Sequence, residues 1–143
     1  MEMNPTFSPE EIAQAAQNNV NLFCFAVVAY AKAHDLSPAE SWAFIGRHFA
    51  LGWEPGLTIP EIARRAARNM LSAGCALQAL SGNESQAVAI MAGWRNAKAF
   101  DRFGLTPAEA DTVFEIFKPI AASLGCRYQW QRQGDTITMT FTR

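Results

Sequence analysis

The sequence predicts an α+β fold, in which N-terminal helices pack on an antiparallel sheet made of two β-hairpins with a helix between them. Two observations predict this class. Four short segments carry the signature of a helix start, and the C-terminal stretch alternates between apolar and polar side chains. The length of 143 residues suits a single domain. We expect a helical part over about 8–73 and a hairpin–helix–hairpin part over about 74–143.

Each helix start combines a hydroxyl residue with a glutamate three positions later and a proline in the first turn. The hydroxyl oxygen accepts from the amide at the third position, and the glutamate accepts from the amide of the hydroxyl residue. Proline is tolerated there because its missing amide would have no partner inside the helix. The four starts are Ser8, Ser37, Thr58 and Thr106.

The first three starts predict helices over Pro9–Ala33, Pro38 to about Leu51, and Ile59 to about Ala73. The middle of the first helix, Leu22–Ala31, is apolar nearly all round, which is typical of a helix that is central or lies in an interface. The second helix carries an apolar stripe, made of Trp42, Ile45 and Phe49.

Beyond Gly74 the pattern changes from helical to alternating. Two short runs, Cys75–Leu80 and Gln86–Ala92, predict a β-hairpin around the turn-rich loop Ser81–Ser85. A short helix is expected over Ala97–Phe103.

The fourth capped helix begins at Pro107, and Pro119 inside it predicts a kink or a break. The last segment predicts a second hairpin that turns at Gly134-Asp135. One face of this hairpin is then aromatic and apolar, and the other is a lattice of glutamines and threonines. The predicted pairs on the aromatic face are Arg132 with Ile137, Trp130 with Met139, and Tyr128 with Phe141.

Composition argues against several classes of function. The net charge of −1 and the pI near 6.1 provide no global field for nucleic acid or an anionic membrane, so neither partner is predicted. The longest apolar run, Leu22–Ala31, has about half the roughly 20 residues of a membrane span. The N-terminus begins Met1-Glu2-Met3, unlike a secretory signal, so the expected location is the cytoplasm.

The three cysteines, Cys24, Cys75 and Cys126, are far apart in the chain. Their odd number and wide spacing predict reduced structural thiols rather than disulfides or a zinc site. The chain also lacks phosphate-binding, zinc-hydrolase and nucleophile-elbow motifs, so no cofactor is predicted.

The order of elements from Gly74 onwards carries a resemblance. A hairpin, an aromatic–glycine break, a helix ending in Leu124-Gly125-Cys126 and a hairpin turning at Gly134-Asp135 follow one another. This order resembles the small α+β domains of the 2-amino-thiazoline-4-carboxylate hydrolase-like and 4-vinyl-reductase-like group, which also close with a Gly-Asp hairpin. The resemblance implies a domain that binds a small, partly apolar organic molecule. The group often has a cysteine beside this turn, where the chain has Thr136 and Ile137, so no catalytic residue is carried over.

A first candidate site lies at the exit of the second helix, where Arg47, His48, Trp53 and Glu54 are close in sequence. A general base, with His48 and Glu54 as candidates, could meet a ligand on an aromatic platform there. In the plainer interpretation Arg47 and His48 complement the negative end of the helix and Trp53 joins the core.

A second candidate site, Trp94-Arg95-Asn96, follows a predicted strand. Arg95 could pair with a carboxylate ligand, although a tryptophan beside an arginine is also typical of a surface cap on the core. Aromatic residues that could line a pocket between the helices and the sheet are Trp53, Trp94, Tyr128, Trp130 and Phe141.

The third helix carries a basic face made of Arg64, Arg65 and Arg68. Glu61 can pair with the first two, which favours a solvated face over a specific anion site. The first helix also carries polar side chains just before its most apolar stretch, and in a central helix these need a buried network or a ligand. They are Asn18, Asn19 and Asn21.

Three hypotheses of function remain. The first is a small-molecule-binding domain with a pocket between the helices and the aromatic face of the sheet. The second is a homodimeric interaction module without a ligand, dimerising through the first helix, with Leu22–Ala31 in the interface, or through a hairpin edge. The third is a hydrolase of a small carboxylate-bearing heterocycle, with His48 or Glu54 as base and Arg95 as anchor. Pocket binding requires open volume beside the aromatic side chains, whereas an interaction module requires an exposed apolar patch and a filled core.

Overall fold

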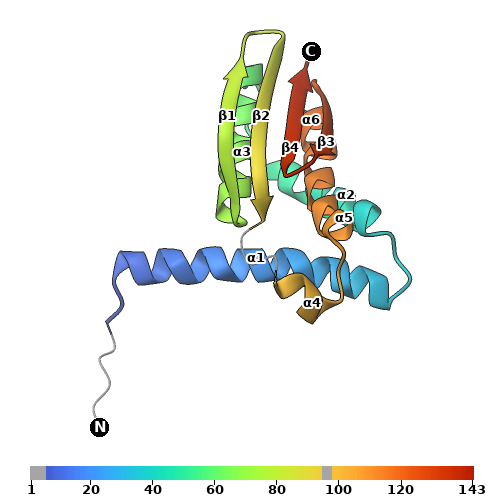
Figure 1. Ribbon diagram of the computed structural model, residues 1–143. Coiled ribbons are helices and arrows are strands. Elements are labelled where there is room, and N and C mark those ends of the chain that lie inside the picture. Colours follow the sequence, from blue (N-terminus) through green and yellow to red (C-terminus); the bar gives the residue numbers. More distant parts are fainter. Residues whose placement is uncertain (1–5, 95–97) are drawn as a thin grey trace.

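The computed structural model describes residues 6–94 and 98–143, and it confirms the predicted α+β class: helices pack on a four-stranded antiparallel sheet (Figure 1). The elements are α1 (Pro9–Ala33), α2 (Pro38–Phe49), the 3₁₀ helix η1 (Ala50–Gly52), α3 (Ile59–Ser72), β1 (Cys75–Gly82), β2 (Gln86–Trp94), α4 (Ala99–Phe103), α5 (Pro107–Ala110), the 3₁₀ helix η2 (Asp111–Ile116), α6 (Phe117–Ser123), β3 (Arg127–Gln133) and β4 (Thr136–Thr142).

The predicted helix starts are present. The hydroxyl groups of Ser8, Ser37, Thr58 and Thr106 each accept from the amide three residues on. At three of them the glutamate also accepts from the amide of the hydroxyl residue, as Glu61 does from Thr58 at 2.7 Å. These hydrogen bonds join residues only three positions apart, which explains why the helix starts could be predicted from the sequence.

The strands follow the order β1-β2-β4-β3, so β4 lies inside the sheet. The register of β3 and β4 is the predicted one, with Tyr128 opposite Phe141 and Gln131 opposite Thr138. The apolar side chains of β4 are buried, while the glutamines of β3 are exposed. In Figure 1 α3 lies behind β1 and β2, and α6 lies behind β3.

The first hairpin is longer than predicted and its loop is shorter. Asn83 Oδ1 accepts from the amides of Ser85 and Gln86 at 2.9 and 3.1 Å, which closes a tight turn. Ser81 and Gly82 therefore remain in the β1–β2 ladder instead of joining the loop.

The helix that begins at Pro107 is broken into α5, η2 and α6, and the break precedes Pro119. Pro119 is the third residue of α6, where its missing amide leaves no helical bond unmade. An unbroken α-helix would require that amide to donate to the carbonyl of Glu115. The chain instead forms the 3₁₀ segment Asp111–Ile116. The break therefore lies upstream of Pro119, where the sequence predicted it.

α1 lies across one end of the fold, and its N-terminal half extends beyond the sheet (Figure 1). Its C-terminal half is fixed by Asn21, which is buried and donates to the carbonyl of Ala73 at 2.9 Å, and by Lys32, which pairs with Glu109 at 2.9 Å. The predicted need of a buried asparagine for a partner is thus met within the protein. None of the described helices is both long and apolar enough to span a membrane.

α2 approaches the broken helix most closely at Gly46. A Cβ atom there would lie 2.2 Å from the carbonyl oxygen of Ile116 and 2.7 Å from Cγ of Pro119. We expect Gly46→Ala to lower the free energy of unfolding by about 1–3 kcal/mol in urea denaturation. The new methyl group would overlap a backbone carbonyl oxygen, which cannot move away by rotating a side chain. Gly52→Ala is the matched control, since no atom lies within 4 Å of its Cβ position. Equal stability of the two variants would contradict this close contact.

Candidate functional site

Arg47 and His48 lie in the last turn of α2, both exposed to solvent. His48 Nδ1 is 3.0 Å from the carbonyl oxygen of Phe44, and its ring centre is 4.8 Å from the Phe44 ring centre. The guanidinium carbon of Arg47 is 5.5 Å from the same ring centre. Both side chains therefore pack on Phe44 at the negative end of the helix, as the plainer interpretation expected.

The side chains of Trp53 and Glu54 have contacts different from those of Arg47 and His48. Trp53 is half-buried against the core, and Glu54 Oε2 accepts from Arg65 Nη2 at 3.2 Å. Among the described residues, His48 contacts Phe44, Glu54 pairs with Arg65 and Trp94 donates to Asp111, so the geometry gives no support to the hydrolase hypothesis.

Trp94 ends β2 and is buried in the core, with its ring centre 5.4 Å from that of Phe25. Its indole Nε1 donates to Asp111 Oδ1 at 3.1 Å. The other two residues of this predicted site, Arg95 and Asn96, lie outside the described residues. The second candidate site is therefore described only at Trp94, which is held by the protein itself.

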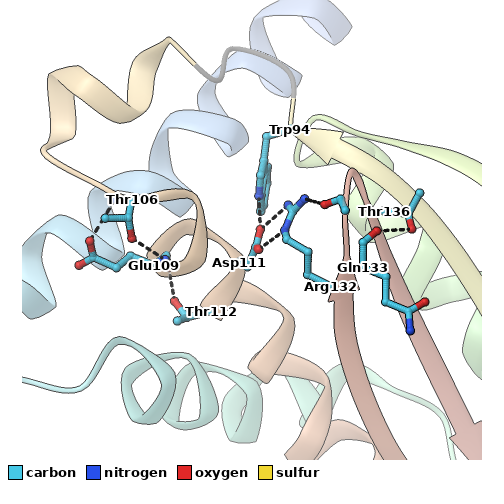
Figure 2. A network of polar contacts seen from close by, with 9 residues as sticks. Trp94, Thr106, Glu109, Asp111, Thr112, Arg132, Gln133 and Thr136 are labelled. Atoms are coloured by element: carbon cyan, nitrogen blue, oxygen red, sulfur yellow. Dashed lines mark hydrogen bonds and ion pairs between the residues drawn. The ribbon is translucent and has the colours of Figure 1, made fainter.

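The centre of this polar network is Asp111, which the sequence analysis did not single out (Figure 2). Asp111 is 2% exposed and accepts from Arg132 through both oxygens, from Nε at 2.5 Å and from Nη2 at 2.8 Å. These bonds raise the pKa of Arg132 above its ordinary value. Two signals could have identified the pair: an aspartate on the apolar side of a helix, and an arginine in the apolar register of the last hairpin.

The aromatic face of the sheet is covered by helix side chains. Phe117 meets Tyr128 with ring centres 5.8 Å apart, and Phe114 meets Trp130 at 5.6 Å. Trp130 Nε1 donates to Glu115 at 2.9 Å. The hydroxyl of Tyr128 is buried with no hydrogen-bond partner among the described residues, and burial raises its pKa well above the ordinary value.

Open volume lies on the other side of these helices. A cavity of about 470 Å³ lies between α1, α2, α3 and α6, and one of about 700 Å³ lies between α1 and α2. The two share Phe23, Val27 and Ile45 in their linings, so they are neighbours, and we name them together the α1–α2 groove. Phe117 lines this groove and also contacts Tyr128, so helix side chains separate the groove from the sheet.

The α1–α2 groove is apolar and exposed. Phe23 is 71% exposed, Tyr30 62%, Phe44 56% and Phe49 57%, and all four line one or both cavities. Phe49 belongs to the apolar stripe predicted for the second helix, yet it faces the groove rather than the core. Exposed apolar patches on soluble proteins commonly mark binding surfaces.

Two opposite charges, Glu40 and Arg47, stand in the groove between α1 and α2. Neither forms an ion pair with a described residue. They are seven residues apart on α2, which is about two helical turns, so they lie on the same side of this helix. Arg47 is thus the one predicted ligand-binding residue that the structure places in this groove among those described.

The three cysteines are reduced and buried. Burial raises the pKa of Cys24 and of Cys75 from 9.0 to about 12, and it also raises the pKa of Cys126. A buried thiol with so high a pKa is a poor nucleophile, because the thiolate is the reactive form. These thiols therefore contribute packing rather than chemistry.

We expect Cys24 and Cys75 of the native protein to react with an aromatic disulfide reagent at least about 30-fold more slowly than in urea. Their raised pKa leaves far less thiolate, and the higher nucleophilicity of the thiolate that remains offsets only part of this loss. Absorbance of the released thiolate measures the rate. The reagent in urea, where all three thiols should react fast, is the control. Rapid native reaction of either residue would show that the site opens.

The described residues contain no group of three or more histidine, cysteine or acidic side chains placed to hold a metal ion. No protein-family model matches the chain, and none of the curated proteins matches it significantly.

Proposed function

We propose that this chain is a homodimeric interaction module that binds a second copy of itself through the α1–α2 groove. The observation that carries the proposal is the contrast between its two apolar surfaces. The aromatic face of the sheet is filled by Phe114 and Phe117, while the groove holds four large aromatic side chains that are more than half exposed. A filled core with an open apolar face is what an interaction module requires.

The exposed area of the chain fits this proposal. The surface of 8729 Å² exceeds the roughly 7,300 Å² expected of a monomer of this mass. The excess of about 1,400 Å² is larger than the ~800 Å² that each partner buries in a standard interface.

The charges of the groove fit a two-fold axis. In a symmetric dimer each contact occurs twice, with the roles of the two copies exchanged. Antiparallel packing of α2 against the second copy's α2 places Glu40 opposite the second copy's Arg47, and the reverse pair follows by symmetry. The two charges are therefore self-complementary, while Phe23 and Phe44 supply the apolar centre that such interfaces favour.

Sedimentation equilibrium of the wild-type protein tests this proposal, and we expect a dimer at micromolar concentration. The single reversals Glu40→Arg and Arg47→Glu are expected to weaken the dimer about tenfold or more, because each creates like-charge contacts. The double variant Glu40→Arg/Arg47→Glu restores the pairs and is expected to dimerise like the wild type. A monomeric wild type, or a double variant weaker than both single variants, would disprove the proposed packing.

A second candidate function is binding of a small apolar molecule in the deeper part of the same groove. The specific observation is the cavity of about 470 Å³, which lies in the size range of small-molecule sites and is lined mainly by apolar side chains. Trp42 lines this cavity, and its indole Nε1 is buried without a hydrogen-bond partner among the described residues. The candidate ligand site is therefore the space between α1, α2, α3 and α6, and not the aromatic face of the sheet that the sequence predicted.

A thermal-shift screen of the wild type against small aromatic carboxylates and heterocycles tests this second candidate. A ligand at 100 times its dissociation constant adds about 2.7 kcal/mol of stability. Binding in this cavity predicts that Val20→Trp, at an exposed position of its lining on α1, abolishes the shift while the protein remains folded. A shift that survives this substitution places the ligand elsewhere, and a flat screen removes the candidate.

A further inference from the structure

A second surface, independent of the dimer, lies at the opposite side of α3. A groove of about 370 Å³ runs between α3 and β1, and we name it the α3–β1 groove. It is lined by Glu61, Arg64, Arg65, Ala67, Arg68, Leu71, Leu77 and Leu80. Its floor is apolar, and one wall carries three arginines.

The other wall is an open sheet edge. β1 pairs only with β2 among the described strands, so the backbone amides and carbonyls along its outer side have no strand partner there. Natural edge strands are usually protected by charged side chains, proline or a short length. β1 has eight residues and contains neither charge nor proline, whereas the other edge strand, β3, carries Arg127 and Arg132.

Leucine side chains of β1 face the helix and remain accessible. A register irregularity between Leu77 and Ala79 puts Leu77 opposite Met91 and Leu80 opposite Ala89. Met91 and Ala89 are buried beneath the helices, so both leucines project to the same side. Leu77 is 38% exposed and Leu80 36%, which leaves apolar area on the floor uncovered.

Not all of the arginines on the α3 wall are neutralised by a carboxylate. Glu61 is engaged in its helix cap, where it accepts from the amide and the hydroxyl of Thr58 at 2.7 and 2.8 Å. Arg65 pairs with Glu54 at 3.2 Å. Arg64 and Arg68 form no ion pair with a described residue. In the described part of the chain Glu61 forms no ion pair with Arg64 or Arg65, so the expected pairing is wrong, and two cations stay available beside the open edge.

We propose that the α3–β1 groove binds an acidic peptide segment in extended form, which adds a strand to the edge of β1. Main-chain hydrogen bonds to β1 provide affinity in this binding mode, and side chains on one face provide specificity. Arg64 and Arg68 are one helical turn apart, about 6 Å along α3. Side chains two residues apart on a strand are spaced by about 6.7 Å, so acidic residues at alternate positions match the two arginines.

The proposed motif is thus acidic–x–acidic–x–apolar. The two carboxylates meet Arg68 and Arg64, and the apolar side chain covers Leu77 or Leu80. A cation and a carboxylate at a partly exposed site attract less strongly as salt is added, so the affinity falls with ionic strength. The proposal does not rest on dimerisation, because none of the residues that line the α3–β1 groove carries the symmetric contacts of Glu40, Arg47 and Phe23.

Fluorescence anisotropy with three labelled octapeptides tests the proposal on the full chain. The first is Thr-Asp-Thr-Asp-Thr-Leu-Thr-Thr, the second has lysine for both aspartates, and the third keeps the first sequence but carries N-methyl groups on the amides of residues 3 and 4. Successive amides of a strand point to opposite sides, so one of the two methylated amides faces β1. We expect the first peptide to bind below about 1 mM and the others at least about tenfold more weakly, since lysine reverses the charge and N-methylation removes an amide donor.

Variants then locate the site. Arg64→Glu with Arg68→Glu is expected to weaken the first peptide at least about tenfold. Arg102→Glu, on the exposed helix α4, is the matched control and should leave its affinity unchanged. The dimer variant Phe23→Glu should also bind normally, which separates failure of this proposal from failure of the dimer. No binding of the first peptide, equal binding of the N-methylated peptide, or equal binding by the doubly reversed protein would each overturn strand addition in this groove.

Discussion

In the proposed dimer, Phe23→Glu is expected to separate the two copies. Phe23 is exposed and lines both cavities of the α1–α2 groove, so a carboxylate there would be buried twice in a symmetric dimer. Burying a charge without a partner is costly, and we expect the dissociation constant of the dimer to rise by at least about 100-fold, or about 2.7 kcal/mol. Sedimentation equilibrium over a range of concentrations measures the change.

The matched control for this result is Leu80→Glu, which places the same charge on an exposed apolar position of the α3–β1 groove. It should leave the dimer intact. The monomer made by Phe23→Glu should keep the secondary structure of the wild type, because Phe23 contributes little to the core of a single chain. If Leu80→Glu separates the copies and Phe23→Glu does not, the interface lies at the sheet edge and the α1–α2 groove has another role.

Asp111→Ala is expected to cause the largest loss of stability among single substitutions of polar residues. It leaves Trp94 Nε1 buried without an acceptor and removes both hydrogen bonds to Arg132. Breaking a buried ion pair costs about 3–5 kcal/mol, and the side chain of Arg132 is 29% exposed, so we expect a loss near the lower end, about 3 kcal/mol. Urea denaturation followed by tryptophan fluorescence measures it.

A double-mutant cycle distinguishes the ion pair from a general effect of truncation. Asp111→Ala with Arg132→Met should lose less stability than the sum of the two single variants, since the second substitution removes the unpaired charge. Asp101→Ala, on the exposed surface of α4, is the control and should change stability by less than about 0.5 kcal/mol. Additive losses in the cycle would show that the two side chains do not depend on each other.

Local patterns in the sequence predicted most of the fold. Helix starts such as Thr58 depend on atoms three residues away, and the register of the last hairpin depends on a two-residue turn. Both are decided within a few residues, so the sequence displays them directly. The sequence predicted the break at Pro119, whereas the structure has it at Asp111–Ile116. Its position depends on the missing amide of Pro119 and also on the packing of Gly46 against the carbonyl of Ile116, which joins distant segments.

The candidate site was harder to predict because its parts come from distant segments. Asp111 and Arg132 are brought together by the packing of η2 on the sheet, and no spacing in the sequence links them. The aromatic residues Tyr128 and Trp130 were assigned correctly to one face, but periodicity cannot show whether a face is left open or filled. Phe114 and Phe117 fill it, so the open volume lies between helices instead.

The interior position of β4 has a consequence for synthesis of the protein. The ribosome produces β1, β2 and β3 before β4, yet β4 must insert between β2 and β3 to complete the sheet. Until Thr136–Thr142 have emerged, β2 has a free edge and the apolar side chains of α6 lack part of their cover. Unpaired edges and exposed apolar surface make nascent chains prone to association. Folding of the complete sheet therefore waits until translation has passed β4.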